Sequence, residues 1–88
     1  MTYLADVAAL LREVTGEDAV WQAGIRPDSR LDGDLRLDSV EMASLDVALR
    51  RRYGDAVDLA GFLAGLDIDQ LIALTVADVA DLVARVAA

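Results

Sequence analysis

The stretch LDSVEMASLDVALRRRYG, residues 37–54, contains the strongest structural signals in the chain. Its apolar residues recur at helical spacing, which predicts a helix over residues 39–53. Asp38 precedes that helix and Glu41 follows three residues later, the pattern of a capping box at a helix start. Gly54 is a stop signal, because glycine readily adopts the backbone conformation that ends a helix. One helix of about four turns is therefore expected here.

The predicted helix carries two apolar stripes, which are expected to adjoin one another. Val40, Ala43 and Val47 form one stripe, and Met42, Leu45 and Leu49 form the other. Because residues three and four apart share a helix face, both stripes are predicted to be buried. Leu37 and Val40 would then anchor the junction between loop and helix. A charge at position 40 would destabilise so small a domain enough to unfold it.

The chain before this helix divides into another helix and a long loop. A first helix is predicted between Thr2, which can cap it, and Gly16, which can end it. Its apolar residues are Leu4, Val7, Leu11 and Val14. Residues 17–37 show no period and hold the single proline, so they are expected to form a loop anchored by apolar side chains. These anchors are Trp21, Ile25, Leu31, Leu35 and Leu37, with Trp21 expected to fill the core.

The chain after Gly54 predicts two short helices and a longer one. Asp58 and Asp67 are placed to cap the short helices. Thr75, with Asp78 three residues later, opens a last helix over about 76–86. The stripe expected to be buried in it is Val79, Leu82, Val83 and Val86. The chain is thus predicted to be all-α, a single domain over residues 1–88 with three main helices plus short helices.

Composition excludes several classes of function. With 16 acidic and 8 basic residues the net charge is −8, which disfavours nucleic acid and anionic membranes as partners. The chain has no cysteine and no histidine, so thiol chemistry, thiolate metal sites and Ser-His triads are impossible. No apolar run could span a membrane and the start lacks a basic signal region, so a cytoplasmic location is expected. The chain is also expected to be a monomer. A non-catalytic role is favoured over an enzyme that would use carboxylates alone.

Ser39 is the residue at which chemistry is expected. It lies after the long loop, in the first turn of the predicted helix, where free backbone N–H groups and the helix dipole favour a phosphodiester on its hydroxyl. No histidine is present to activate the hydroxyl as a nucleophile. Ser39 is therefore predicted to be modified by another enzyme.

At these residues the sequence resembles the acyl carrier protein family, which includes the peptidyl carriers. The signature of that family is an Asp-Ser-Leu-type tripeptide at the start of its second helix, preceded by a Leu-Gly-like pair. The corresponding stretch here is LRLDSV, residues 35–40. The first helix, the long loop, the signature, the second helix ending at Tyr53-Gly54 and the last helix opening at Thr75-Val76 all follow the family order.

The resemblance implies a cofactor and a set of partners. Ser39 would accept 4′-phosphopantetheine from coenzyme A through a separate phosphopantetheinyl transferase, and cargo would be held as a thioester on the thiol of that arm. Asp38 would cap the helix and assist the magnesium ion of the transferase. A cargo-loading enzyme, an acyltransferase or an adenylating ligase, and downstream pathway enzymes would dock beside the arm. The docking residues would be Val40, Glu41 and Met42, with Arg50, Arg51 and Arg52 selecting the partner by charge.

The sequence departs from the family pattern at several places. Arg36 stands where glycine is usual, and Ser44 stands where a docking glutamate is usual. The arginines at 50–52 replace a run that is largely acidic in fatty-acid carriers, which argues against a housekeeping fatty-acid role. Residues 55–74 are longer and more apolar than the family's third-helix region, and would form a lid or an added partner surface.

The favoured function is an acyl carrier in a bacterial secondary-metabolite pathway of the polyketide or antibiotic type. The lysine-free composition, rich in alanine, aspartate and arginine, is typical of a high-GC bacterial source. The alternatives are an aminoacyl or peptidyl carrier of a nonribosomal-peptide-type pathway and an unmodified helical interaction module. Peptidyl carriers usually place a Gly-Gly pair before the serine, whereas Gly33 is alone and distant from it.

Overall fold

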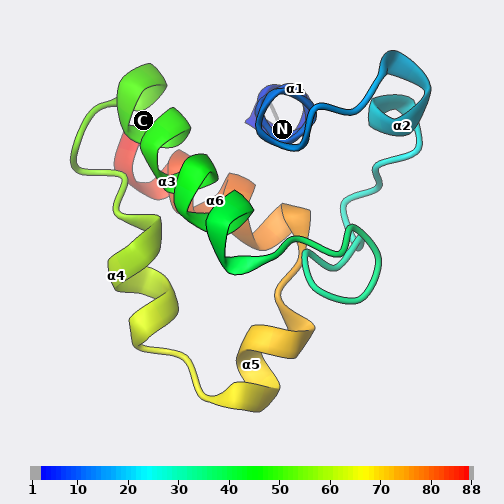
Figure 1. The fold of residues 1–88 in the computed structure, drawn as a ribbon. Helices are drawn as coiled ribbons and strands as arrows, with labels where there is room; N and C mark the ends of the chain where they lie inside the picture. Colours follow the sequence, from blue (N-terminus) through cyan, green and yellow to red (C-terminus); the bar gives the residue numbers. More distant parts are fainter. Residues whose placement is uncertain (1–2, 88) are drawn as a thin grey trace.

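The computed structural model describes residues 3–87, which form an all-α bundle (Figure 1). The helices, in chain order, are α1 (Tyr3–Thr15), α2 (Ala19–Ala23), α3 (Ser39–Tyr53), α4 (Leu59–Ala64), α5 (Ile68–Ala73) and α6 (Val76–Ala87). The predicted all-α class is confirmed. Among these residues, no helix is long and apolar enough to cross a membrane. Thr2, the predicted cap of the first helix, lies outside the described residues.

The helix boundaries follow local capping signals. Gly16 ends α1 with a positive φ of 72°, and Gly54 ends α3 with a φ of 103°. The carboxylates of Asp58 and Asp67 accept hydrogen bonds from backbone N–H groups in the first turns of α4 and α5. Before α6, the backbone N–H of Thr75 donates to Asp78 Oδ2 at 3.0 Å. The predicted caps of these three helices are therefore confirmed.

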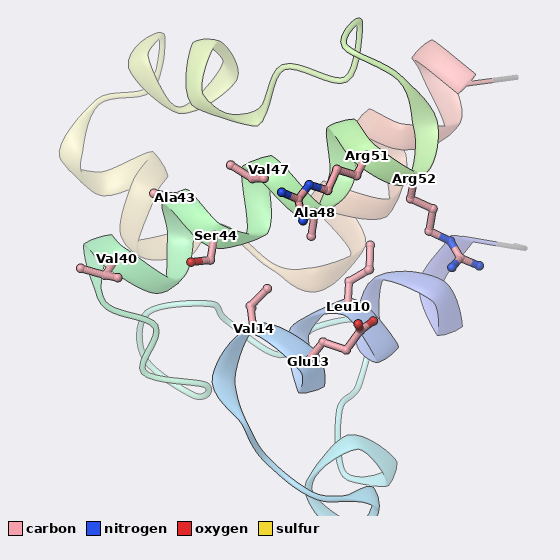
Figure 2. A pocket seen from close by; sticks show the side chains of 10 residues that line it. All are labelled: Leu10, Glu13, Val14, Val40, Ala43, Ser44, Val47, Ala48, Arg51 and Arg52. Atoms are coloured by element: carbon pink, nitrogen blue, oxygen red, sulfur yellow. The ribbon is translucent and has the colours of Figure 1, made fainter.

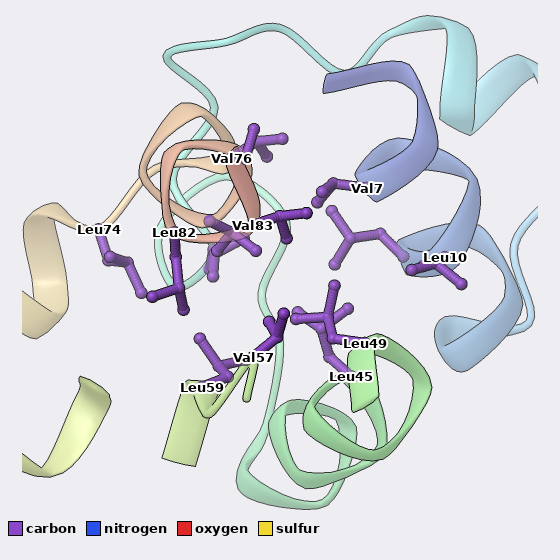
Figure 3. Close-up of a cluster of buried hydrophobic side chains, with 14 of the residues drawn as sticks. Val7, Leu10, Leu45, Leu49, Val57, Leu59, Leu74, Val76, Leu82 and Val83 are labelled. Atoms are coloured by element: carbon purple, nitrogen blue, oxygen red, sulfur yellow. The ribbon is translucent and has the colours of Figure 1, made fainter. Parts of the chain in front are cut away.

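The hydrophobic core lies between α1, α3 and α6 (Figure 3). Each helix contributes residues at helical spacing, and the loops add further ones. The fully buried side chains include Val7, Leu11, Leu31, Leu45, Leu49, Val57, Leu59, Val76, Val79 and Val83. Full burial of such a side chain contributes about 1.5–3 kcal/mol to folding. This set is what keeps so small a bundle folded.

The predicted burial of α3 is correct for one stripe and wrong for the other. Leu45 and Leu49 are fully buried, whereas Val40 is 71% exposed and Val47 47% exposed. At 3.6 residues per turn, the two stripes lie on nearly opposite sides of the helix and do not adjoin. Since α3 packs on the bundle with one side only, the stripe of Val40, Ala43 and Val47 faces outward. Val40 is therefore not an anchor of the loop–helix junction, although Leu37 is buried.

The predicted stripe of α6 also needs one correction. Val79, Leu82 and Val83 are buried as expected, but Val86 is 38% exposed. Val86 has the helical phase of the buried stripe, yet it lies in the last turn of α6, where the neighbouring helices give it less cover. Val76 and Ala80, both fully buried, complete the stripe toward the start of the helix instead.

The predicted long loop contains a short helix that the sequence pattern did not reveal. Asp18 caps this helix, α2, by accepting a hydrogen bond from the backbone N–H of Trp21 at 2.9 Å. The predicted anchors all contact the core: Leu31 and Leu37 are buried, and Trp21, Ile25 and Leu35 pack against it. Trp21 is only half-buried, however, so it covers the edge of the core and does not fill it as expected.

Backbone hydrogen bonds tie the rest of this loop to the start of α6. The N–H of Leu31 donates to the carbonyl of Leu74 at 3.0 Å, and the N–H of Val76 donates to the carbonyl of Ser29 at 2.9 Å. An isolated antiparallel bridge joins Arg30 to Thr75 between these two bonds. The loop is thereby fixed before it enters α3.

Candidate functional site

Ser39 is the first residue of α3 and is exposed to solvent. The N-cap is the residue before it, Asp38, whose Oδ1 accepts a hydrogen bond from the N–H of Glu41 at 2.7 Å. In return, Glu41 Oε1 accepts from the N–H of Asp38 at 3.1 Å, so the predicted capping box is confirmed. Within residues 3–87 the hydroxyl of Ser39 has no hydrogen-bond partner. Because Asp38 caps α3, the hydroxyl of Ser39 is not used in the cap.

The turn before Ser39 contains an unusual backbone conformation. Arg36 has a φ of 56°, the one positive φ among the described residues other than glycines. A side chain in this left-handed region costs about 1–2 kcal/mol. The turn is held by two backbone hydrogen bonds, from Arg36 N–H to Asp32 O at 3.1 Å and from Leu37 N–H to Leu31 O at 2.9 Å. Arg36 therefore occupies a backbone position that would suit glycine.

The three residues after Ser39 project in different directions, because successive residues are about 100° apart around a helix. Val40 is exposed and lines a groove between α1 and α3. Glu41 is held in the capping box. Met42 is half-buried and lines a separate apolar pocket beside α5. The predicted docking residues Val40, Glu41 and Met42 thus do not form one surface.

The first of these hollows, here called the α1–α3 groove, is open and has a volume of about 740 Å³ (Figure 2). Side chains from both helices line it, apolar at its centre and charged toward the end of α3. The lining residues are Leu10, Glu13, Val14, Val40, Ala43, Ser44, Val47, Ala48, Arg51 and Arg52.

The second hollow, here called the α5 pocket, has a volume of about 430 Å³. All but one of its lining residues are apolar, and they come from the loop before α3, from α3 itself and from the α5 region. They are Leu31, Asp32, Leu37, Met42, Ile68, Leu71, Ile72 and Leu74. Leu37 and Met42 flank Ser39 in the sequence, so the pocket lies beside the start of α3. The apolar excess of residues 55–74 was the only sequence signal of this pocket.

The three arginines at the end of α3 have different surroundings. Arg50 forms ion pairs with Asp46, at 3.2 Å, and with Asp58 before α4. Arg52 lies 3.6 Å from Asp6 of α1 and lines the α1–α3 groove. Arg51 is exposed, lines the groove, and forms no ion pair within residues 3–87. Arg50 therefore connects α3 to α4, and of the predicted docking arginines only Arg51 and Arg52 line the groove.

One buried polar atom lies at the far end of α3 from Ser39. The hydroxyl of Tyr53 is buried and has no hydrogen-bond partner among the described residues. Burial raises the pKa of this phenol above its ordinary value. The ring of Tyr53 meets the ring of Tyr3 edge-on, with 5.5 Å between the ring centres. Tyr53 thus belongs to the packing of α3 on α1.

Within residues 3–87, no cluster of three or more acidic side chains is arranged to hold a metal ion. Comparisons of the sequence with protein-family models and curated proteins, and of the structure with solved structures, found no match.

Proposed function

We propose that this chain is a carrier protein that holds an acyl intermediate as a thioester on a 4′-phosphopantetheine arm attached to Ser39. The observation that supports this most is the free, exposed hydroxyl of Ser39 at the first position of α3. A serine at a helix start is usually the N-cap, but here Asp38 has that role. Because Ser39 does not cap the helix, its hydroxyl is available for modification by another enzyme.

The start of α3 suits a phosphodiester. In the first turn of α3, the N–H of Glu41 donates to the carboxylate of Asp38, and the N–H of Met42 donates to the carbonyl of Asp38. The N–H groups of Ser39 and Val40 have no hydrogen-bond partner among the described residues. Free N–H groups and the positive end of the helix dipole both favour an anion beside Ser39. When bound, the arm would supply the thiol that the cysteine-free chain lacks.

Ser39 has no partner that could activate it from within the chain, which contains no histidine. A separate phosphopantetheinyl transferase would therefore attach the arm. An acyltransferase or an adenylating ligase would load the cargo, and further pathway enzymes would act on it. The left-handed conformation of Arg36 supports the same family alignment, since it falls where carriers usually have glycine.

The α5 pocket favours acyl cargo over aminoacyl cargo. Its lining is apolar except for Asp32, and it lies next to Leu37 and Met42 on either side of Ser39. A hydrocarbon chain gains about 25 cal/mol for each Å² that such a lining removes from water, whereas a charged ammonium group would lose its hydration there. Since the arginines at 50–52 argue against a fatty-acid role, the pathway we propose is a secondary-metabolite pathway of the polyketide type. An aminoacyl carrier is the alternative.

A modification assay tests the proposal. The purified chain is incubated with coenzyme A and a broad-specificity phosphopantetheinyl transferase, and its intact mass is measured. One phosphopantetheine should be added to the wild type and to Ser44→Ala, a matched control because Ser44 is another exposed serine of α3. Ser39→Ala should remain unmodified while keeping the helical circular dichroism of the wild type. An unmodified wild type, or a modified Ser39→Ala, would contradict the proposal.

A further inference from the structure

We infer that the α1–α3 groove binds an amphipathic helix of a partner protein, and that Arg51 selects a partner helix with carboxylates at the end of the groove farther from Ser39. The inference concerns the groove alone and holds whether or not Ser39 carries an arm. It can therefore fail while the proposed modification of Ser39 stands, and the reverse is also possible.

The groove exposes apolar residues, at helical spacing, to solvent. Val40, Ala43 and Val47 form one line along α3, and the two valines are 71% and 47% exposed. The α1 side adds Leu10 and Val14 (Figure 2). A continuous apolar strip rimmed by charged residues is typical of a surface that a partner covers. A groove between two helices suits a third helix, whose apolar face can lie along it.

The charges at the end of the groove indicate the polarity of that partner. Arg51 follows Val47 by four residues, so it lies on the same side of α3 as the exposed apolar residues, at their end. Figure 2 shows its guanidinium extending along α3 toward Val47. Arg50 and Arg52 each pair with carboxylates of the chain, but Arg51 pairs with none within residues 3–87. A carboxylate of the partner would provide the missing counter-charge.

The opposite side of the groove restricts the arrangement further. Glu13 of α1 also lines the groove. The groove is therefore positive along α3, where Arg51 and Arg52 lie, and negative along α1. A bound helix would therefore turn its carboxylates toward Arg51 and Arg52 and a neutral or basic side toward Glu13. The strip from Val40 to Arg51 is about 16 Å long, which matches about three turns of a partner helix.

A second copy of the chain is a poorer occupant than a different protein. Each copy carries a net charge of −8, so two copies repel one another. The overall charge would also favour basic ligands over acidic ones. Selection of acidic peptides by this groove would therefore be a local effect, since the net charge of the whole chain would select basic peptides. The two causes thus predict different peptides.

The test is a peptide selection against the unmodified, folded chain. The probe is a display library of helical peptides about four turns long. Apolar residues are fixed along one face, and the other positions are varied among Glu, Lys, Gln and Ala. The enriched peptides should carry Glu clustered at one end. In NMR titrations they should perturb the backbone amides of residues 40–51 and of α1, and they should bind Ser39→Ala as tightly as the wild type.

Matched variants identify the residue responsible. Arg51→Glu should weaken binding of the enriched peptides about tenfold or more, and the loss should shrink as salt rises. Arg26→Glu changes the net charge equally but lies outside the groove, so it should leave affinity within about twofold. Arg51→Gln serves if the glutamate variant is unfolded by circular dichroism.

Enrichment of Lys-rich peptides, a footprint at the α5 pocket, or equal effects of the two arginine variants would overturn the inference. Failure to enrich any peptide, or self-association through residues 40–51, would overturn it as well.

Discussion

Both sides of α3 carry apolar residues, but only one side is buried. One side buries Leu45 and Leu49 completely, and the other exposes Val40 and Val47. Apolar residues recur at helical spacing on both. The difference arises outside the helix, because α1, α6 and the segment around Val57 cover only one side. Folding accounts for the apolar residues on the core side of α3, and it does not account for those on the exposed side.

The largest expected difference between the two sides is their tolerance of charge. Leu49→Asp should lower the free energy of unfolding by more than about 3 kcal/mol, because it buries an unpaired carboxylate and leaves a cavity. Val40→Asp should change it by less than about 0.5 kcal/mol, since position 40 is largely exposed. Urea unfolding of the two variants measures both values, and similar losses would mean that the assignment of sides is wrong.

The arginines at the end of α3 provide a second, smaller comparison. Arg50→Ala removes the ion pairs to Asp46 and Asp58 and should cost about 1 kcal/mol of stability. Arg51→Ala removes no ion pair within the described residues and should cost less than about 0.3 kcal/mol. Thermal unfolding of the two variants under the same conditions checks this. If Arg51→Ala were the more destabilising, Arg51 would be a structural residue rather than a docking residue.

The core side of α3 contains one polar atom that can be removed. Tyr53→Phe deletes a buried hydroxyl with no hydrogen-bond partner among the described residues, and should raise stability by up to about 1 kcal/mol at neutral pH. A lower stability in the variant would show that the hydroxyl is satisfied, for instance by water.

The same variant predicts a difference in alkaline sensitivity. Burial raises the pKa of Tyr53, so the folded chain holds this proton more tightly than the unfolded chain does. The resulting stabilisation is complete below the unfolded pKa of about 10 and is lost as the pH rises through the folded pKa. Urea unfolding at neutral and alkaline pH should show an alkaline loss that is smaller in Tyr53→Phe than in the wild type. Equal losses of stability in the variant and the wild type would mean that other groups cause the alkaline loss.

The turn that leads into α3 gives the smallest predicted effect. Arg36→Gly relieves a left-handed arginine but makes the unfolded chain more flexible, so a net gain of about 0.5 kcal/mol is expected. Leu35→Gly, at the preceding residue, is the control, and it should destabilise because Leu35 packs against the core. Chemical denaturation measures both changes. A loss on Arg36→Gly would show that the arginine side chain contributes to the turn.

The parts of the structure that the sequence predicted are local ones. The capping box of Asp38 and Glu41 and the glycine ends of α1 and α3 depend on residues a few positions apart, so their patterns can be read directly. The start of α6 follows in the same way from Thr75 and Asp78. The position of Ser39 at the start of α3 follows from the same cap.

The parts that the sequence did not predict depend on what packs against each element. The burial of Val40 and Val86 was predicted wrongly because spacing identifies an apolar stripe without identifying a neighbour to cover it. The helix α2 is one and a half turns long, too short for its period to be recognised, although Asp18 was an available signal. The two hollows combine residues distant in sequence, and the different environments of Arg50 and Arg51 could not be inferred from a run of identical residues.

Peptide fragmentation distinguishes Ser39 from the neighbouring serines as the attachment point of the proposed arm. After treatment with coenzyme A and transferase, tryptic cleavage behind Arg36 and Arg50 releases residues 37–50, which contain both Ser39 and Ser44. Fragment ions that divide the peptide between these serines should place the whole mass increase on the part with Ser39. An increase on the part with Ser44, or no increase in a chain shown to be folded, would show that Ser39 is not the attachment point.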